Sequence, residues 1–169
     1  MKVGACNLAL YESPHPDPSL DPDPALIALI NSAKSTLFCS IYSLTAPAIR
    51  DAITAAAKRG VTVTVVADAG EAATSSSLVP SLVAANIPVR LWGDAWRLCH
   101  LKAAVADGKA VALGSMNWTS AGERSNVECL LIFTGIEVSR GGLAASITAQ
   151  INTAYQAGKP IAISTGGTP

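Results

Sequence analysis

The sequence feature that most constrains the fold is an alternation of strand-like and helix-like segments in the first half of the chain. STLFCSIYSL and VTVTVVAD carry the β-branched and aromatic residues typical of strands, whereas ALIALINSAK and PAIRDAITAAAKRG carry apolar residues at helical spacing. Strands that alternate with helices are typical of α/β domains. We therefore predict an α/β fold, and the length of 169 residues predicts a single domain over residues 1–169.

The second half of the chain changes to a pattern of antiparallel strands. LKAAVADGKAVALGS predicts a hairpin with its turn at Asp107-Gly108, because this dipeptide readily adopts the left-handed backbone of tight hairpin turns. NVECLLIF predicts a further strand, and residues 142–157 predict a closing helix followed by a flexible tail at about 161–169. The closing helix has apolar residues at i, i+4 spacing: Leu143, Ile147, Ile151 and Tyr155.

Prolines and capping residues predict where the elements begin. Five prolines between residues 14 and 24 predict a stiff, extended connection, the proline-rich loop 13–24. Asp23 is the predicted N-cap of the first helix, with Pro24 in its first turn. Thr45 is the predicted cap of the second helix, and a shorter helix is interrupted or begins near Pro80.

The charge composition limits the partners of the protein. Basic and acidic residues number 12 each, so no global positive field gathers nucleic acid, and any polyanion must be held locally. Only 14% of the residues are charged, which a buried subunit interface would explain.

The sequence also predicts where the protein resides and how its cysteines behave. It contains no stretch of about 20 apolar residues and no signal-peptide pattern, so we expect a cytoplasmic protein without stable membrane association. The cysteines lack C-x-x-C spacing, which favours reduced thiols over a metal site. They are Cys6, Cys39, Cys99 and Cys129.

The hairpin carries the side chains that are best suited to catalysis. In a strand over residues 100–106, His100 and Lys102 project from one face while Leu101 points into the packing on the other. Ser115 and Asn117, just beyond the returning strand, add a hydroxyl and an amide beside the same face. A neutral imidazole can attack phosphorus while an ammonium and neutral donors stabilise the phosphoryl oxygens, so this set suits a phosphoester without a metal.

Two carboxylates are further candidates. Glu128 is the best placed to accept a hydrogen bond from the second imidazole nitrogen of His100 and so hold its tautomer. Asp107 is a candidate catalytic residue too, but it also occupies the hairpin turn, and the turn role is favoured.

These residues resemble a known motif. His100, Lys102 and Asp107 fit H-x-K-x-x-x-x-D, followed by G-S-x-N at residues 114–117 and by NVE at 126–128. The pattern is similar to the HKD motif of the phospholipase D superfamily, and the resemblance covers most of residues 35–134. It implies a mixed sheet flanked by helices on both faces, that is, an α-β-α sandwich.

The resemblance also implies a reaction. Members of this superfamily hydrolyse phosphodiesters without a metal, through a covalent phosphohistidine and a second histidine that acts as general acid. The chain holds one copy of the motif, and His15 lacks a neighbouring lysine and donors. A homodimer with His100 of each subunit in one site is therefore expected, in which Lys102, Ser115 and Asn117 bind the phosphate and Glu128 orients the imidazole.

Aromatic and basic residues around the motif are candidates for substrate binding. Trp96 and Trp118, together with Trp92, could stack on bases while Arg97 and Arg124 grip flanking phosphates, although tryptophans near a cleft often pack a core or an interface instead. We expect a nuclease acting on DNA or RNA with nucleic acid as its partner and no cofactor. A phospholipid hydrolase and a non-catalytic phosphate- or nucleic-acid-binding module remain the alternatives.

Overall fold

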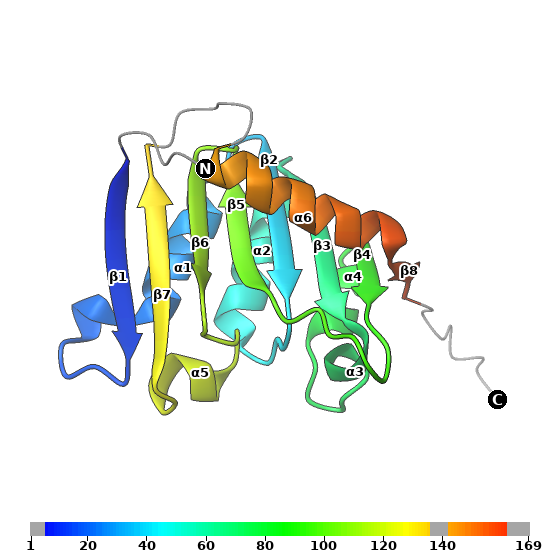
Figure 1. Ribbon diagram of the computed structural model, residues 1–169, viewed down its shortest axis with the longest axis horizontal. Coiled ribbons are helices and arrows are strands. Elements are labelled where there is room, and N and C mark those ends of the chain that lie inside the picture. Colours follow the sequence, from blue (N-terminus) through cyan, green and yellow to red (C-terminus); the bar gives the residue numbers. More distant parts are fainter. Residues whose placement is uncertain (1–5, 136–141, 162–169) are drawn as a thin grey trace.

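The computed structural model describes residues 6–135 and 142–161, which form one mixed eight-stranded sheet in the order β1-β7-β6-β5-β2-β3-β4-β8 (Figure 1). Strands β2, β3 and β4 run parallel to one another, and every other neighbouring pair is antiparallel. The strands are β1 (Asn7–Ser13), β2 (Thr36–Ile41), β3 (Thr62–Asp68), β4 (Val89–Trp92), β5 (Lys102–Ala106), β6 (Ala110–Gly114), β7 (Glu128–Thr134) and β8 (Lys159–Pro160).

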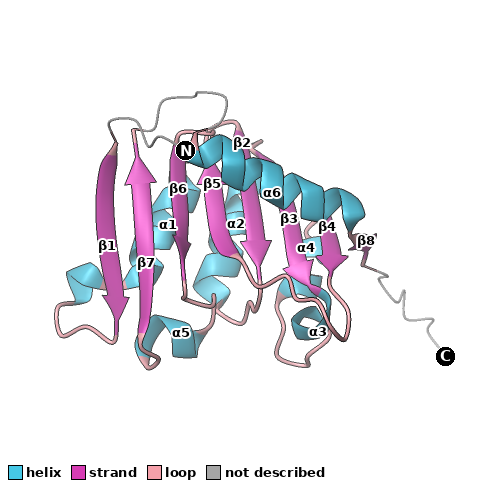
Figure 2. Ribbon diagram, viewed as in Figure 1, coloured by secondary structure: helices cyan, strands magenta, loops and turns pink. Residues whose placement is uncertain are grey.

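Helices cover both faces of this sheet (Figure 2). Helices α1, α2 and α4 contribute to the core on one face, while α6 crosses the opposite face. The predicted α-β-α sandwich is therefore confirmed. The helices are α1 (Pro22–Ser32), α2 (Pro47–Lys58), α3 (Ala69–Ala72), α4 (Val79–Ala84), α5 (Ser120–Arg124) and α6 (Leu143–Ala157). No helix in the described part of the chain is long and apolar enough to cross a membrane.

The side chains of β5 alternate between the two faces, as its sequence predicts. Ala104 and Ala106 pack in the core beneath α1 and α2, whereas Val105 packs in the core beneath α6. The four apolar residues predicted to form the stripe of the closing helix all pack in that second core. Leu101 belongs to the α6 side too, which leaves His100 and Lys102 for the other side of the strand.

Three predicted helix starts needed correction or refinement. Helix α1 begins at Pro22, not after Asp23, because the first N–H groups of a helix need no intrahelical partner and prolines are tolerated there. The loop 13–24 is therefore not extended throughout, since it also contains a 3₁₀ turn at Pro18–Leu20.

The N-cap of α2 is Ala46 rather than Thr45, and no side chain caps it. Helix α4 begins beside Pro80 rather than being interrupted by it.

The segment between the closing helix and the predicted tail forms a short strand that the sequence did not indicate. Lys159 and Pro160 form β8 and pair with β4 at the edge of the sheet. The predicted tail beyond Ile161 lies outside the described residues.

Asp107 is a structural residue of the hairpin. Its backbone φ is +53° and that of Gly108 is +65°, so the predicted left-handed turn is confirmed. The Asp107 carboxylate accepts hydrogen bonds from the backbone N–H groups of Lys34, Ser35 and Thr36 at 2.8–2.9 Å. Burial raises the pKa of this carboxyl, but the backbone donors together outweigh that effect and hold the pKa below its usual value. Asp107 lies at the opposite end of β5 from His100, which favours the turn role over direct catalysis.

We predict that Asp107→Ala destabilises the fold by about 1–3 kcal/mol, because three backbone donors lose their acceptor. Urea denaturation measures the free energy of unfolding, and Lys109→Ala in the same hairpin is the control. An Asp107→Ala variant as stable as the Lys109→Ala control would contradict the structural role.

Candidate active site

His100 and Lys102 lie at the edge of the sheet where β5 begins and where the parallel strands β2 and β3 end. The His100 side chain is exposed, while Lys102 is only 6% exposed. Lys102 Nζ lies 2.9 Å from His100 Nε2 and donates a hydrogen bond to the His100 carbonyl oxygen at 3.0 Å. The predicted pairing of imidazole and ammonium is therefore present in the structure.

The contact between these two side chains sets the state of the imidazole. A charged ammonium has no lone pair, so Lys102 is the donor and His100 Nε2 the acceptor. In this arrangement the proton of a neutral ring lies on Nδ1, and Nε2 holds the lone pair that a nucleophile requires. Burial lowers the pKa of Lys102, whereas the negative charge of Glu128 acts in the opposite direction.

Tyr42 completes this cluster, although the sequence analysis did not single it out. The residue follows β2, and its ring meets the His100 ring edge-on with centroids 4.6 Å apart. Lys102 Nζ lies 4.7 Å from the centroid of the same ring, within the range of a cation–π interaction. The signal that could have found Tyr42 is its place directly after a strand predicted to lie in the same sheet as His100.

Ser115 and Asn117 follow β6, whose last residue Gly114 pairs with Lys102. Ser115 Oγ accepts a hydrogen bond from the Cys129 N–H at 3.1 Å, which anchors the hydroxyl to β7. Asn117 Oδ1 is buried and has no hydrogen-bond partner among the described residues. A Cβ atom at Gly114 would lie 2.1 Å from the Cys129 carbonyl oxygen, so only glycine permits this approach of β6 to β7.

Glu128 lies close enough to Lys102 for its charge to act on the ammonium. Its carboxylate accepts a hydrogen bond from Asn126 Nδ2 at 3.4 Å, and the described structure shows no hydrogen bond between Glu128 and His100. Its charge instead supports the ammonium of Lys102. Glu128 therefore belongs to the electrostatic surroundings of the site, and its orienting role stays a prediction.

The predicted substrate-binding residues separate into two groups. Trp118 is 1% exposed and packs in the core, so its prediction as a base-stacking residue is wrong. Its backbone explains the placement, because the Trp118 carbonyl accepts hydrogen bonds from Thr45 and Ala46 at the start of α2. Arg124 is exposed at the end of α5, where its charge acts on Asp23 and Glu123.

Trp96 and Arg97 lie on a tight turn that leads directly to His100. Trp96 is 93% exposed. The Asp94 carboxylate accepts hydrogen bonds from the Trp96 and Arg97 N–H groups and forms an ion pair with the Arg97 guanidinium, which holds the turn in shape. Trp92 lies beneath this turn, with the Arg97 guanidinium 5.8 Å from the centroid of its ring. These residues present an exposed aromatic ring and a cation beside the site.

A buried carboxylate that the sequence analysis missed fixes the backbone before His100. Asp68 is 2% exposed, and its Oδ2 accepts a hydrogen bond from the Cys99 N–H at 2.8 Å. Its Oδ1 accepts hydrogen bonds from the Gly70 and Glu71 N–H groups at the start of α3. Asp68 therefore ties the end of β3 to the segment that carries His100. An aspartate that ends a predicted strand and precedes small residues was the available signal.

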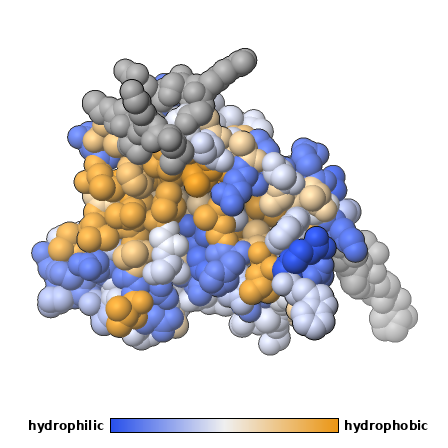
Figure 3. All heavy atoms as spheres, viewed as in Figure 1, coloured by the Kyte–Doolittle hydropathy of each residue, from blue (hydrophilic) through white to orange (hydrophobic). Residues whose placement is uncertain are grey.

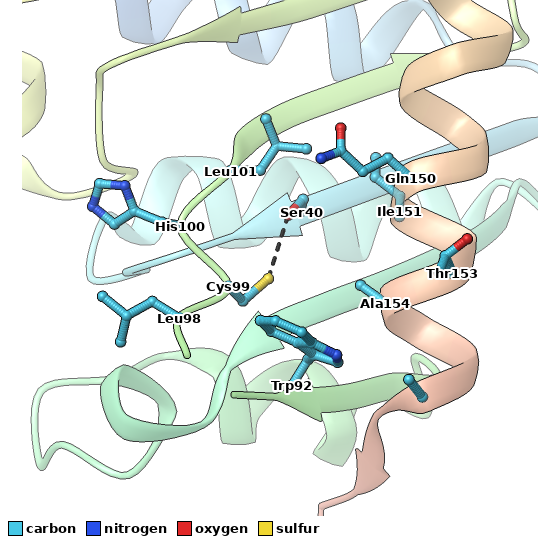
Figure 4. Close-up of a pocket in the computed structure, with 11 residues that line it drawn as sticks. Ser40, Trp92, Leu98, Cys99, His100, Leu101, Gln150, Ile151, Thr153 and Ala154 are labelled. Carbon is cyan, nitrogen blue, oxygen red and sulfur yellow. Dashed lines mark hydrogen bonds between the residues drawn. The ribbon is translucent and has the colours of Figure 1, made fainter. Parts of the chain in front are cut away.

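An apolar groove of about 500 Å³ runs along the other side of this segment, between it and α6 (Figure 4). Trp92, Leu101 and Ile151 are among its lining residues. The side chains of Cys99 and Leu101 point toward α6, whereas the His100 ring points away from it. No group of three or more potential metal ligands is found among the residues that the structure describes.

Comparison with known proteins identifies the family. The sequence model described as "Cardiolipin synthase, PLD-like domain" matches residues 26–142. The chain belongs to the phospholipase D superfamily. The resemblance to the phospholipase D superfamily is thereby confirmed.

Individual relatives come from bacteria and from eukaryotes. The chain is 32% identical to the mitochondrial cardiolipin hydrolase of Xenopus tropicalis over 78% of its length and to that of Mus musculus over 75%, and it spans 59% and 56% of those proteins. The structure of the phospholipase D family member Nuc from Salmonella typhimurium superposes with a TM-score of 0.82 at 26% identity, covering 94% of this chain and all of Nuc. NucT from Helicobacter pylori gives a TM-score of 0.81 at 24% identity over 93% of this chain and all of that protein.

We predict that oxyanion binding at this site is lost at a lower pH than an ordinary lysine would allow, because burial lowers the pKa of Lys102. Deprotonation removes the positive charge as the pH rises through that pKa. Binding of inorganic sulfate, which does not titrate in this range, is followed by NMR from pH 6 to 11. A Lys34→Ala control keeps this profile, whereas an alkaline loss only at the pH of free lysine would contradict the prediction.

Proposed function

We propose that the protein is a metal-independent phosphodiesterase that cleaves DNA or RNA through a covalent phosphohistidine. The observation that carries the proposal is the contact between Lys102 Nζ and His100 Nε2 at 2.9 Å, which leaves a neutral imidazole beside a cation that can bind phosphoryl oxygens. Membership of the phospholipase D superfamily supports the same class of reaction.

The residues of the site suit each step of such a reaction. When a phosphodiester binds, the Lys102 ammonium turns from Nε2 to the phosphoryl oxygens, and His100 Nε2 forms a bond to phosphorus as the bond to the leaving oxygen breaks. The leaving oxygen takes a proton from a second imidazolium. Water then gives a proton to that second imidazole, attacks phosphorus and releases His100. Ser115 and Asn117 lie beyond the neighbouring strand β6, where their side chains can stabilise the negative oxygens.

A second copy of the chain supplies the second imidazole in this proposal. The chain has only two histidines, and His15 lies in an exposed turn where its ring hydrogen-bonds the backbone of Asp17. His100 is exposed at the edge of the sheet and therefore accessible to the His100 of a partner subunit. A two-fold axis through this edge would make each His100 a nucleophile in one reaction and an acid in the other.

An uncovered apolar face of the sheet supports the homodimer. Helix α6 crosses the sheet from β4 toward β6, and no described helix covers the same face of β1 and β7 (Figure 1). Leu8 and Leu10 of β1 are 57% and 48% exposed, and they pair with Phe133 and Leu131 of β7 on this face. Figure 3 shows apolar residues gathered over these strands. Apolar surface of this kind is typical of a protein interface.

The choice of nucleic acid over lipid depends on the surroundings of His100. Trp96 is almost fully exposed on a turn held by Asp94, and Arg97 lies beside it, so the turn offers a stacking surface and a cation to a flexible polyanion. A phospholipid hydrolase is the second candidate, because the groove beside α6 is apolar and several relatives are described as cardiolipin hydrolases.

We predict that His100→Ala lowers phosphodiester hydrolysis about a thousandfold or more, because the nucleophile is lost. Plasmid, single-stranded oligonucleotides, RNA and cardiolipin vesicles are incubated with wild type and variant in EDTA. His15→Ala, which removes the other histidine of the chain, is the matched control and keeps full activity. Loss of wild-type activity in EDTA would refute the metal-independent mechanism, and turnover of cardiolipin alone would favour the second candidate.

We predict that Leu8→Glu combined with Leu10→Glu yields an inactive monomer, because four charges introduced per dimer would be buried in its interface. Light scattering measures the mass in solution. Leu20→Glu, at another exposed leucine, is the control and leaves the dimer intact. An active wild-type monomer would rule out the shared site.

A further inference from the structure

Tyr42 contacts both of the motif residues that carry the proposed chemistry. Its ring centroid is 4.6 Å from that of His100, with an angle of 65° between the ring planes, and 4.7 Å from Lys102 Nζ. The two contacts are made by one rigid ring at the end of β2, so movement of either partner relative to the other would break one of them. From this geometry we infer that Tyr42 is a positioning residue, whose aromatic face holds the Lys102 ammonium beside the His100 imidazole.

A buried ammonium needs such a partner. Lys102 is 6% exposed, and it forms no salt bridge in the described part of the chain. Its Nζ has two hydrogen-bond acceptors, Nε2 and the carbonyl oxygen of His100, and both belong to the same residue. The electron-rich face of Tyr42, which follows β2, is a third source of attraction. It continues to act on Lys102 when the ammonium turns from His100 Nε2 to a phosphate.

Glu71 strengthens this role of the tyrosine. The residue lies in α3, directly after the Asp68 turn, and its carboxylate acts on the Tyr42 phenol. Burial raises the pKa of Tyr42, and the negative charges of Glu71 and Asp68 raise it further, so the phenol keeps its proton. A carboxylate beside the phenol shifts electron density from the hydroxyl into the ring. The aromatic face then becomes a better partner for a cation.

The other groups around Lys102 do not replace Tyr42. Glu128 on β7 acts on the ammonium through its charge. It makes no hydrogen bond to Lys102 in the described structure. Tyr42 is thus the group that fixes the direction of the ammonium as well as stabilising its charge.

This inference rests on the proposed function where it concerns catalysis, so its test has two independent measurements. The first is the kinetics of phosphodiester hydrolysis. Tyr42→Phe keeps the ring and is expected to retain kcat within about threefold, whereas Tyr42→Leu is expected to lower kcat about tenfold or more, because the ammonium loses its fixed position. Tyr11→Leu removes a tyrosine from the core beside α1 and is the matched control.

The second measurement needs no activity. The Lys102 side-chain resonance is followed by NMR against pH, with Lys102→Arg to assign it. Tyr42→Leu is expected to shift the titration of Lys102 to lower pH, Glu71→Gln to shift it less, and Tyr42→Phe and Tyr11→Leu to leave it close to wild type. Thermal unfolding of each variant shows that the fold is kept.

The outcomes separate the inference from the function. A titration of Lys102 that Tyr42→Leu leaves unchanged overturns the positioning role, whatever the enzyme hydrolyses. Equal losses of activity in Tyr42→Phe and Tyr42→Leu also overturn it, because the hydroxyl rather than the ring would then be responsible. An inactive wild type in which Tyr42→Leu still shifts the titration refutes the proposed function and leaves the positioning of Lys102 intact.

Discussion

The antiparallel pairing of β2 with β5 is the constraint on which the rest of the structure depends. It joins the parallel half of the sheet to the antiparallel half, with Ser40 opposite Ala103. Because β5 runs against β2, the beginning of β5 lies beside the end of β2. His100 and Lys102 therefore meet Tyr42, which is about 60 residues distant in the sequence.

Two buried or partly buried carboxylates fix this pairing at its two ends. Asp107 accepts three backbone hydrogen bonds from the segment that leads into β2, and Asp68 accepts one from Cys99 just before His100. A shift of β5 by one residue would break both sets and would turn His100 and Lys102 toward α6. The carboxylates thus fix the register of β5 that places His100 and Lys102 on one face and the packing residues on the other.

The sequence predicted the parts of this arrangement that depend on local pattern. The hairpin at Asp107-Gly108, the apolar stripe of α6 and the alternation of His100 and Lys102 with Leu101 follow from periodicity and turn chemistry, and the structure confirms them. The start of α1 was misplaced because two prolines can both occupy the first turn of a helix. Trp118 was misjudged because its burial depends on backbone contacts with the start of α2.

The site residues that could not be predicted from the sequence have one physical property in common. Tyr42 and Asp68 act across strands, and their partners are set by the strand order β5-β2-β3, which no local pattern reveals. The resemblance to the HKD motif gave the side chains of the reaction but not the groups that hold them. Those groups come from the parallel half of the sheet.

The zero net charge of the chain and the burial of Lys102 both bear on how a phosphate can be bound. A protein without a global positive field must bind a phosphate at short range, and a cation in a poorly solvated site interacts with an anion more strongly than one in water. Burial also lowers the pKa of Lys102, so the site needs nearby groups that favour the ammonium form. Glu128 provides a negative charge from β7, and Tyr42 provides an aromatic face from β2, which unlike a carboxylate does not compete with the phosphate by forming an ion pair. An aromatic face is therefore better suited than a second carboxylate to a lysine that must release its resting contact and bind a substrate anion.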